Sequence, residues 1–359
     1  MKENRIMLDM TMLSNPYTGL GQFSLYLGNY LLNNNKSKNK YDFLLTSKID
    51  KNIFNCNEYN VKYFNFLRKK MSDIIPSLLY PNYKIWHVLS QQSQYFPSHN
   101  KFCNIFTIHD LNFLKEENDE LIDRKMYFIQ KRIHNSDVIT TISNYAANDI
   151  KRNFNLNGKN IEIIYNGVEI KKYFRPKIPK FITKTNKIIF SIGTITEKKN
   201  FHVLIPMMKY LPEYTLVIAG KKENEYANKI ESDISRYDLT NNVILAGEIN
   251  DEDKYWLYEK CDAFVFPSLL EGFGMPIIEA LSMGKPVFSS LYTSLPEIGG
   301  DIVNYWHSFQ PKYMSDFFLK NLKIRNEDHF FEEKAINRAK SFSWNLAVNQ
   351  YQSLYNKLL

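Results

Sequence analysis

Apolar runs of strand length recur through the first half of the chain, separated by amphipathic stretches. The apolar runs cover residues 6–8, 43–45, 104–108 and 138–142, and the stretches of helical character include residues 22–32 and 124–134. Strands that alternate with helices are typical of an α/β domain built on a parallel sheet. We therefore predict an α/β domain for the first half of the chain.

The second half repeats this rhythm, which predicts a second parallel sheet. Its apolar runs cover residues 188–192, 215–219, 243–246, 263–266 and 286–290, with a helix-length segment after each. Between the halves, Pro176 and Pro179 stand among polar residues and disfavour a continuous helix or inner strand.

These patterns predict three parts of the chain: an N-terminal domain over residues 1–170, a linker over residues 171–187 and a C-terminal domain over residues 188–342. The tail from residue 331 onward has a helical composition with a break between Phe342 and Trp344. We expect its last helix, about residues 343–359, to cross back to the first domain.

Composition agrees with two globular domains. A chain of 359 residues is longer than one hydrophobic core usually supports, and its 44% hydrophobic and 23% charged residues are ordinary values. No apolar run reaches the roughly 18 residues of a membrane-spanning helix, and the polar start is followed by too few apolar residues for a signal peptide. We expect a cytoplasmic protein. Cys56, Cys103 and Cys261 lack disulfide or metal-ligand spacing, so we expect reduced thiols.

The net charge of +8 comes from Lys and Arg residues that are scattered along the chain, and we predict no nucleic-acid partner. One segment, residues 63–80, mixes aromatic and aliphatic residues with Arg68, Lys69 and Lys70. This pattern fits an amphipathic helix packed on the first domain with a basic edge. It also fits an interfacial helix in peripheral contact with an anionic membrane. The sequence leaves both interpretations open.

The densest chemical signal is the segment 267–280, which reads PSLLEGFGMPIIEA. A strand ends there, a glycine-rich turn follows, and a helix is predicted to begin near Pro276. The unpaired N–H groups at such a helix start favour a bound phosphate, and Gly272 and Gly274 permit close approach. Glu271 and Glu279 can accept hydrogen bonds from sugar hydroxyl groups. Taken alone, the two glutamates also fit a turn and a capping or salt-bridging role.

The segment 271–279, EGFGMPIIE, resembles the signature of retaining glycosyltransferase family 4. Further pieces of this family follow in the expected order: GTITEKKN at 193–200, AG at 219–220, AGE at 246–248 and PEIGG at 296–300. The first half resembles the family more loosely, through TGLGQ at 18–22, HDL at 109–111, TIS at 141–143 and NGV at 166–168. The resemblance implies the GT-B fold, in which two Rossmann-like domains face each other across a cleft.

The resemblance also implies roles for individual residues. Lys199, together with Lys198, is expected to bind the diphosphate of a nucleotide-sugar donor. Glu279 is expected to bind the ribose hydroxyl groups, and Glu271 those of the transferred sugar. The remaining donor-binding positions of the second domain are Gly247, Glu248, Gly272, Phe273, Gly274 and Met275. Many relatives carry an arginine where this chain has Thr194 or Lys198, and a lysine at that place loses bidentate geometry.

In the first domain, His109 follows the apolar run 104–108, at the carboxyl end of a predicted strand, where open α/β sheets bind ligands. The resemblance makes His109 a catalytic contact to the donor sugar, with Asp110 beside it. The alternative is a structural histidine and a turn-forming aspartate.

Gly19 and Gly21 do not complete a dinucleotide-binding fingerprint, because Ser24 stands at the third glycine position. We predict instead a flexible donor loop whose backbone N–H groups contact the diphosphate or the reacting sugar. A plain tight turn is the alternative.

The resemblance implies a retaining hexosyltransferase that uses a nucleoside-diphosphate sugar and no further cofactor. The form GTxxxKKN is similar to mannosyltransferase-like members from bacterial surface-polysaccharide synthesis, so the expected donor is GDP-mannose, ahead of UDP-sugars and GDP-fucose. The expected acceptor is a growing glycan, such as O-antigen or capsule, on undecaprenyl diphosphate at the inner membrane.

We also expect no divalent metal, because an ammonium group beside a helix N-terminus can stabilise the departing diphosphate and no Asp-x-Asp stands at a strand end. Two other classes stay open on the same fold: a sugar-nucleotide epimerase or phosphorylase, and a non-catalytic glycan-binding scaffold.

Overall fold

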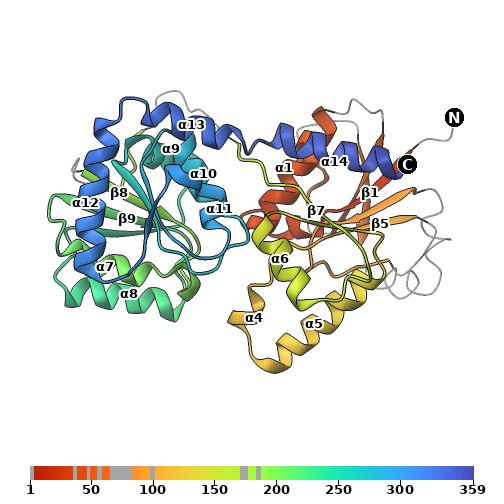
Figure 1. The fold of residues 1–359 in the computed structure, drawn as a ribbon, viewed down its shortest axis with the longest axis horizontal. Coiled ribbons are helices and arrows are strands. Elements are labelled where there is room, and N and C mark those ends of the chain that lie inside the picture. Colours follow the sequence, from red (N-terminus) through yellow and green to blue (C-terminus); the bar gives the residue numbers. More distant parts are fainter. Residues whose placement is uncertain are drawn as a thin grey trace. The chain divides into compact units, whose positions relative to one another are not determined.

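The computed structural model describes residues 4–34, 39–46, 49–54, 59–64, 83–97, 102–169, 177–182 and 187–359. The chain divides into two compact units (Figure 1). The first unit comprises Met1–Gly167 and Ser343–Leu359, and the second comprises Val168–Phe342. Each unit is built on one parallel sheet, so the predicted fold class, two Rossmann-like α/β domains, is confirmed. The last helix, α14 (Trp344–Leu358), is part of the first unit.

The sheet of the first unit has seven strands in the order β3-β2-β1-β4-β5-β6-β7, and all neighbours pair in parallel. The strands are β1 (Arg5–Asp9), β2 (Lys40–Thr46), β3 (Asn60–Phe64), β4 (Ile85–Val88), β5 (Cys103–Thr107), β6 (Val138–Thr141) and β7 (Ile161–Ile163). The four predicted strands correspond to β1, β2, β5 and β6. Strand β4 was not predicted, because its four residues include a histidine and are too few to show a clear hydrophobic periodicity.

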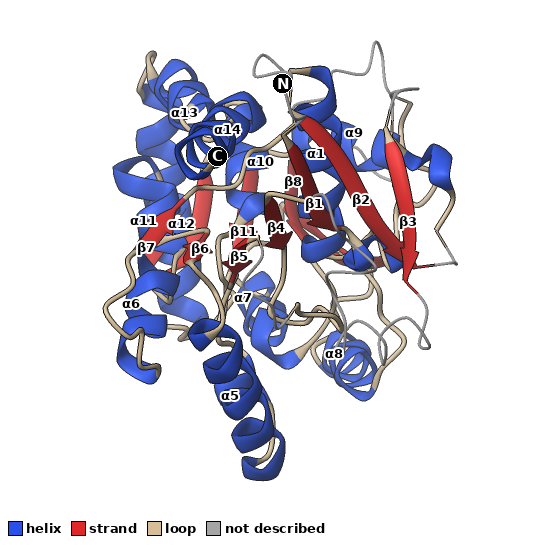
Figure 2. Cartoon of the chain, turned by 90° about the vertical axis from the view of Figure 1, so that its right-hand side faces the viewer, coloured by secondary structure: helices blue, strands red, loops and turns tan. Residues whose placement is uncertain are grey.

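Helices cover both faces of this sheet (Figure 1, Figure 2). Successive side chains of a strand point to opposite faces, so Ile6 and Leu8 face one core and Met7 faces the other. Helices α1 (Gly19–Asn33) and α14 cover the first face, and α5 (Asp119–His134) and α6 (Asn144–Asn153) cover the second. The remaining short elements are η1 (Thr11–Ser14), η2 (Lys51–Ile53) and α4 (Phe113–Glu116).

The sheet of the second unit has six parallel strands in the order β10-β9-β8-β11-β12-β13. They are β8 (Lys187–Ile192), β9 (Tyr214–Ala219), β10 (Val243–Gly247), β11 (Ala263–Phe266), β12 (Val287–Ser290) and β13 (Asn304–Trp306). All five strands predicted for this half are confirmed, and β13 is additional.

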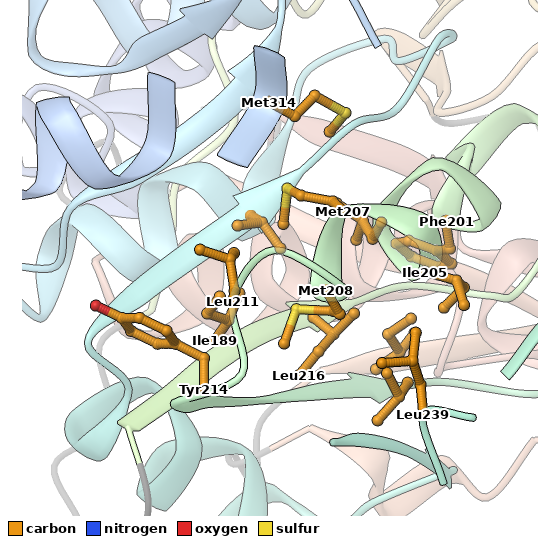
Figure 3. Close-up of a cluster of buried hydrophobic side chains, with 14 of the residues drawn as sticks. Ile189, Phe201, Ile205, Met207, Met208, Leu211, Tyr214, Leu216, Leu239 and Met314 are labelled. Atoms are coloured by element: carbon orange, nitrogen blue, oxygen red, sulfur yellow. The ribbon is translucent and has the colours of Figure 1, made fainter. Parts of the chain in front are cut away.

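The main core of the second unit lies between the sheet and three helices, α7 (Leu204–Met208), α8 (Glu225–Arg236) and α12 (Pro311–Glu327). Ile189 and Leu216 of the sheet form one cluster there with Met208 of α7 (Figure 3). Phe190 points to the opposite face, where its ring meets Tyr258 of α9 (Asp251–Lys260) at a centroid distance of 5.0 Å. The remaining elements are η3 (Glu197–Lys199), η4 (Phe201–Val203), α10 (Met275–Ser282), α11 (Leu295–Gly299), η5 (Gly300–Ile302) and α13 (Phe331–Lys340).

The segment 63–80, read as one amphipathic helix, needs a correction at its start. Tyr63 and Phe64 are the last residues of strand β3, where pairing with β2 fixes them in an extended conformation. Residues 65–80 lie outside the described part of the chain, as does Cys56. Cys103 and Cys261 are free thiols. Among the described helices, none is both long enough and apolar enough to cross a membrane.

Candidate functional site

Three glycines stand side by side at the carboxyl ends of β8, β9 and β10. The N–H group of Gly193 donates to the carbonyl of Ala219 at 3.0 Å, and that of Gly220 donates to the carbonyl of Gly247 at 2.7 Å. A Cβ atom on Gly220 would lie 1.9 Å from the Gly193 carbonyl oxygen, and the φ angle of Gly220 is 144°. Only glycine fits there. The three glycine backbones therefore lie together at the carboxyl edge of the sheet, which is where open α/β sheets bind ligands.

The segment after Gly193 carries the two lysines expected to bind phosphate. Its turn η3 ends at Asn200, which has a φ angle of 58° and donates from Nδ2 to the Pro267 carbonyl at 3.2 Å. The backbone carbonyl of Lys198 accepts a hydrogen bond from the Leu269 N–H group at 2.7 Å. These bonds join the lysine turn to the segment that leaves β11, so the motifs at 193–200 and 267–280 form one site.

Lys199 and Glu271 form an ion pair at the centre of this site. Lys199 Nζ lies 2.5 Å from Glu271 Oε1, and the two side chains are only 13% and 14% exposed. The ammonium group also lies over the ring of Phe266, 5.1 Å from its centroid. Because breaking a mostly buried ion pair leaves a charge poorly solvated, each partner depends on the other. A polyanionic ligand that reaches Lys199 can take over the role of the Glu271 carboxylate.

Helix α10 begins directly after the glycine-rich loop, as predicted. Its N-terminal cap is Gly274, with a φ angle of 112°, and Pro276 stands in the first turn. A Cβ atom at position 274 would lie 2.7 Å from Leu295 Cδ2, so packing and backbone conformation both require glycine. The helix start offers backbone N–H groups and the positive end of the helix dipole to an anion.

Glu279, in the second turn of α10, is held by two residues of α9. Tyr258 donates its hydroxyl to Glu279 Oε2 at 2.7 Å, and Lys254 Nζ lies 3.3 Å from Glu279 Oε1. Burial, reinforced by the adjacent Glu279, raises the pKa of Tyr258 well above its ordinary value, so the hydroxyl stays a donor. Tyr258 and Lys254 were not among the site residues predicted from sequence. Their spacing of four residues, which places them on one face of a helix, was the available signal.

The other donor positions of the second unit lie along the same region. Glu248 follows β10 and is exposed, and the structure gives its carboxylate no partner among the described residues. The Lys222 side chain passes near Gly247, 3.8 Å from where a Cβ atom would stand. Phe273 is buried, and its ring meets that of Phe342 edge to face at 5.6 Å. Phe273 therefore contributes packing and backbone rather than an exposed ring.

In the first unit, His109 stands directly after β5, where the sequence predicted it, but its ring is almost wholly buried. Its Nε2 lies 2.8 Å from the Leu89 carbonyl, and its ring meets Phe23 edge to face at 4.6 Å. Burial lowers the pKa of His109 to about 4. Because a carbonyl only accepts, Nε2 carries the proton and Nδ1 of the neutral ring is left as an acceptor.

The backbone around His109 is fixed by Gln91, which was not among the predicted site residues either. Gln91 Oε1 accepts from the His109 N–H group at 3.1 Å, and Nε2 donates to the Asp110 carbonyl at 3.0 Å. Arg132 of α5 donates in turn to the Gln91 carbonyl at 2.7 Å. Asp110 Oδ1 accepts from the Asn112 N–H group at 3.0 Å, which is a turn-forming contact. The signal was hidden because Gln91 and Arg132 stand far from residue 109 in the sequence.

Gly19 and Gly21 are not part of a flexible loop, so that prediction was wrong. They form the first turn of α1, where the Thr18 side chain accepts from the Gly21 N–H group at 3.2 Å. A Cβ atom on Gly21 would lie 2.1 Å from the Asn15 carbonyl oxygen. Close approach of the chain explains this glycine, and the helix start keeps its N–H groups in fixed positions. Within the described ranges, no three His, Cys, Asp or Glu side chains are grouped as a metal site.

Comparisons with known proteins match both halves of the chain. The model of the family described as glycosyl transferases group 1 matches residues 175–338, and that of glycosyltransferase family 4 matches residues 84–172. The chain is 26% identical over 375 residues to O-antigen chain mannosyltransferase B of Escherichia coli, covering 96% of this chain and 97% of that protein.

Two further similarities add detail. The chain is 26% identical over 245 residues to the N-acetylgalactosamine-N,N'-diacetylbacillosaminyl-diphospho-undecaprenol 4-alpha-N-acetylgalactosaminyltransferase of Campylobacter jejuni, covering 67% of this chain and 65% of that protein. Among solved structures, sucrose-phosphate synthase from Thermosynechococcus elongatus matches with a TM-score of 0.75 and 18% identity, covering 99% of each chain. This last likeness shows a shared fold.

Proposed function

The chain belongs to glycosyltransferase family 4 and has the GT-B fold, and on this premise we propose that it transfers mannose from GDP-mannose to a hydroxyl group of a lipid-linked glycan. The observation that carries the proposal is the ion pair between Lys199 and Glu271 beside the start of α10, with Glu279 one turn further along. A cation, a helix N-terminus and two carboxylates match a diphosphate joined to hydroxyl-rich groups at both ends.

The proposed chemistry follows from the charges. When the bond between the sugar and the diphosphate breaks, negative charge grows on the departing phosphate, and the Lys199 ammonium stabilises it. Glu271 then loses its ion-pair partner and accepts hydrogen bonds from the hydroxyl groups of the transferred sugar. Glu279, oriented by Tyr258, accepts from the ribose hydroxyl groups. Because lysine supplies the positive charge, the proposal requires no divalent metal.

Retention at the anomeric carbon is also part of the proposal. The described donor site contains Glu271 as an ion-pair partner of Lys199 and Glu279 as a partner of Tyr258. We therefore assign neither carboxylate the role of a covalent nucleophile. The acceptor hydroxyl instead attacks on the face that the diphosphate leaves, and the departing phosphate takes up its proton. His109, neutral and presenting Nδ1 as an acceptor, is assigned to a hydroxyl of the donor sugar.

The acceptor class is inferred from the relatives. The E. coli relative is named for the O-antigen chain, and the Campylobacter relative for a diphospho-undecaprenol substrate. We infer a glycan on undecaprenyl diphosphate as acceptor, which would bring the enzyme to the cytoplasmic face of the inner membrane. Residues 63–80, with their three consecutive basic residues, are the segment proposed for that contact.

The proposal is tested by a donor screen. The purified chain is incubated in EDTA with GDP-mannose, GDP-fucose or UDP-sugars and a mannosylated acceptor on a short polyprenyl diphosphate. Release of GDP and the anomeric configuration of the product are measured by NMR. We expect an α-mannosyl product from GDP-mannose alone, and a strong loss of product with Glu271→Gln. Turnover only with a UDP-sugar would contradict GDP-mannose as the donor. Turnover only with added Mg²⁺ would contradict metal independence. No turnover with any donor would favour a non-catalytic glycan-binding scaffold.

A further inference from the structure

The loop after β12 contains a strained residue. Within the described part of the chain, four residues other than glycine have positive φ angles: Asn157, Asn200, Asp238 and Thr293. Asparagine and aspartate tolerate the left-handed region, whereas a β-branched residue is rarely found there. Thr293, with a φ angle of 58°, is the β-branched member of the four. Such strain persists only when the surrounding structure enforces it, and it concentrates at functional sites.

The hydroxyl of Thr293 contacts the donor site directly. It accepts a hydrogen bond from the Glu271 N–H group at 3.1 Å and donates its own proton to the Tyr292 carbonyl at 2.8 Å. The second bond orients the hydroxyl so that a lone pair is available for Glu271. Thr293 therefore fixes the backbone of the residue whose carboxylate pairs with Lys199.

The two residues after Thr293 continue the contact with the same loop. Ser294 is fully buried and its hydroxyl lies 3.0 Å from the Glu271 carbonyl and 2.9 Å from the Phe273 carbonyl. Leu295 packs against Gly274, the cap of α10. Three consecutive residues thus hold the loop 271–274 by an N–H group, two carbonyl groups and a close packing contact. The left-handed turn at Thr293 is what directs the chain into this arrangement.

We propose that Thr293 is a positioning residue for sugar transfer, and that its strained conformation is kept because its hydroxyl sets the place of Glu271. The proposal rests on the proposed function, since Glu271 is there the contact to the transferred sugar. The role assigned to Thr293 runs through Glu271, and we assign it no direct contact with the diphosphate or the ribose. Its loss is therefore expected to impair the chemical step more than the binding of the nucleotide.

Three substitutions separate the hydroxyl from the strain. Thr293→Gly removes both, Thr293→Val keeps the shape and the strain without the hydroxyl, and Thr293→Ser keeps the hydroxyl without the β-branch. Asp238→Gly is the matched control, because Asp238 has a φ angle of 55° in the same unit and is exposed. For each variant, Tm, the Kd for GDP, and kcat and KM for transfer are measured.

We expect kcat to fall about tenfold to hundredfold in Thr293→Gly and Thr293→Val, the loss typical of a misplaced reacting group. The Kd for GDP should stay within about twofold, the size of effect expected away from such features. Thr293→Ser should keep kcat within about threefold, and Asp238→Gly should match the wild type. Thr293→Gly should melt at or above the wild-type temperature, because glycine adopts positive φ without strain.

Two results would overturn the proposal while leaving the proposed function intact: wild-type kcat in Thr293→Gly and Thr293→Val, or parallel losses of Tm, GDP affinity and kcat in all three variants. The first would make the hydroxyl irrelevant, and the second would make Thr293 a purely structural residue. Failure of the proposed function has a different signature, because the wild-type chain itself would then transfer no sugar.

Discussion

The two units share one architecture but arrange their polar residues differently. In the second unit, the candidate side chains are charged, partly exposed and paired with one another: Glu279, for example, is 24% exposed and meets both Lys254 and Tyr258. In the first unit, His109 is 3% exposed, neutral, and hydrogen-bonded to backbone. A partly exposed ion pair can exchange its partner for a charged ligand, whereas a neutral ring that is hydrogen-bonded to backbone has no charge to exchange.

This difference indicates which of the two units should contribute most of the binding free energy for the nucleotide-sugar donor. In the proposed function, the second unit supplies the charge that recognises a nucleoside diphosphate, and the first supplies the neutral His109 ring with Nδ1 as an acceptor. Substitutions in the second unit should therefore change nucleotide binding and catalysis strongly. Substitutions in the first unit should act on stability or on smaller details of sugar orientation.

The largest effect is expected for Lys199→Met. This change removes the charge that we propose stabilises the departing phosphate, and it leaves the Glu271 carboxylate without its ion-pair partner. We expect kcat for transfer to fall about hundredfold to thousandfold, as for loss of one preorganised group at a developing charge. Steady-state kinetics with the donor and acceptor measures it.

Lys187→Met is the matched control for Lys199→Met. Lys187 pairs with Glu213 at 2.9 Å in the same unit, but its side chain is 53% exposed. Exposed pairs contribute little, so this variant should keep wild-type kinetics. Equal losses in the two variants would mean that general destabilisation, and not phosphate stabilisation, explains the effect.

The next effect is a pH dependence of stability in the first unit. Burial lowers the pKa of His87 to about 3 and that of His109 to about 4, from an ordinary value of 6.5. Between about pH 6.5 and pH 4 the unfolded chain therefore binds more protons than the folded chain. The free energy of unfolding should fall as the pH drops through this window, on the order of 3 kcal/mol per histidine.

Fluorescence can assign this loss to the first unit. The chain has four tryptophans, and replacing Trp256 and Trp306 by Phe leaves Trp86 and Trp344, both in the first unit, as reporters. Urea unfolding at pH 7.0, 5.5 and 4.5 is compared with a His87→Gln variant. We expect a shallower pH slope for the variant, and an identical slope would contradict the assignment to His87.

A moderate effect is expected at Glu279, the proposed contact to the ribose. Glu279→Gln should raise the donor KM about tenfold, because an amide replaces a charged acceptor. Tyr258→Phe removes only the orienting hydroxyl and should raise KM roughly threefold, the equivalent of a fraction of one hydrogen bond. Isothermal titration with GDP gives the same ranking without acceptor. If Tyr258→Phe proved worse than Glu279→Gln, Tyr258 would be the direct contact.

The smallest effect is predicted for the backbone support of His109. Gln91→Leu removes two hydrogen bonds to residues 109 and 110 and keeps a similar volume. We expect kcat/KM for the sugar donor to fall only about twofold, the low end of the value of one neutral hydrogen bond, with GDP affinity unchanged. A fall in kcat/KM as large as the loss expected for Lys199→Met would contradict the expectation that substitutions in the first unit affect catalysis less than those in the second.

The same contrast explains what could be predicted from sequence. In the second unit, Lys199, Glu271 and Glu279 stand in short contiguous motifs at strand ends, and topology alone brings those ends together. The start of α10 near Pro276 could also be predicted, because the glycine-rich turn and the proline that mark it are adjacent in the sequence. Tyr258 was not predicted because it contacts the site from a neighbouring helix. Thr293 was not predicted because its role depends on a backbone conformation that no sequence motif indicates.

In the first unit the decisive contacts are distant in sequence. The hydrogen-bond partners of His109 are Leu89 and Gln91, which stand about twenty residues earlier in the sequence, after strand β4. No local sequence pattern predicts these contacts. Gly19 and Gly21 were misread as a loop because glycines are common in turns. Here Gly21 is required by close packing against Asn15 in the first turn of a helix.

The most direct test is hydrogen–deuterium exchange of the full chain with and without GDP, in EDTA, on the wild type and on Glu279→Ala. We expect protection in peptides covering residues 193–200, 247–250 and 271–279, and loss of that protection in the variant. Protection confined to the first unit, or protection that survives Glu279→Ala unchanged, would contradict a donor site at the carboxyl edge of the second sheet.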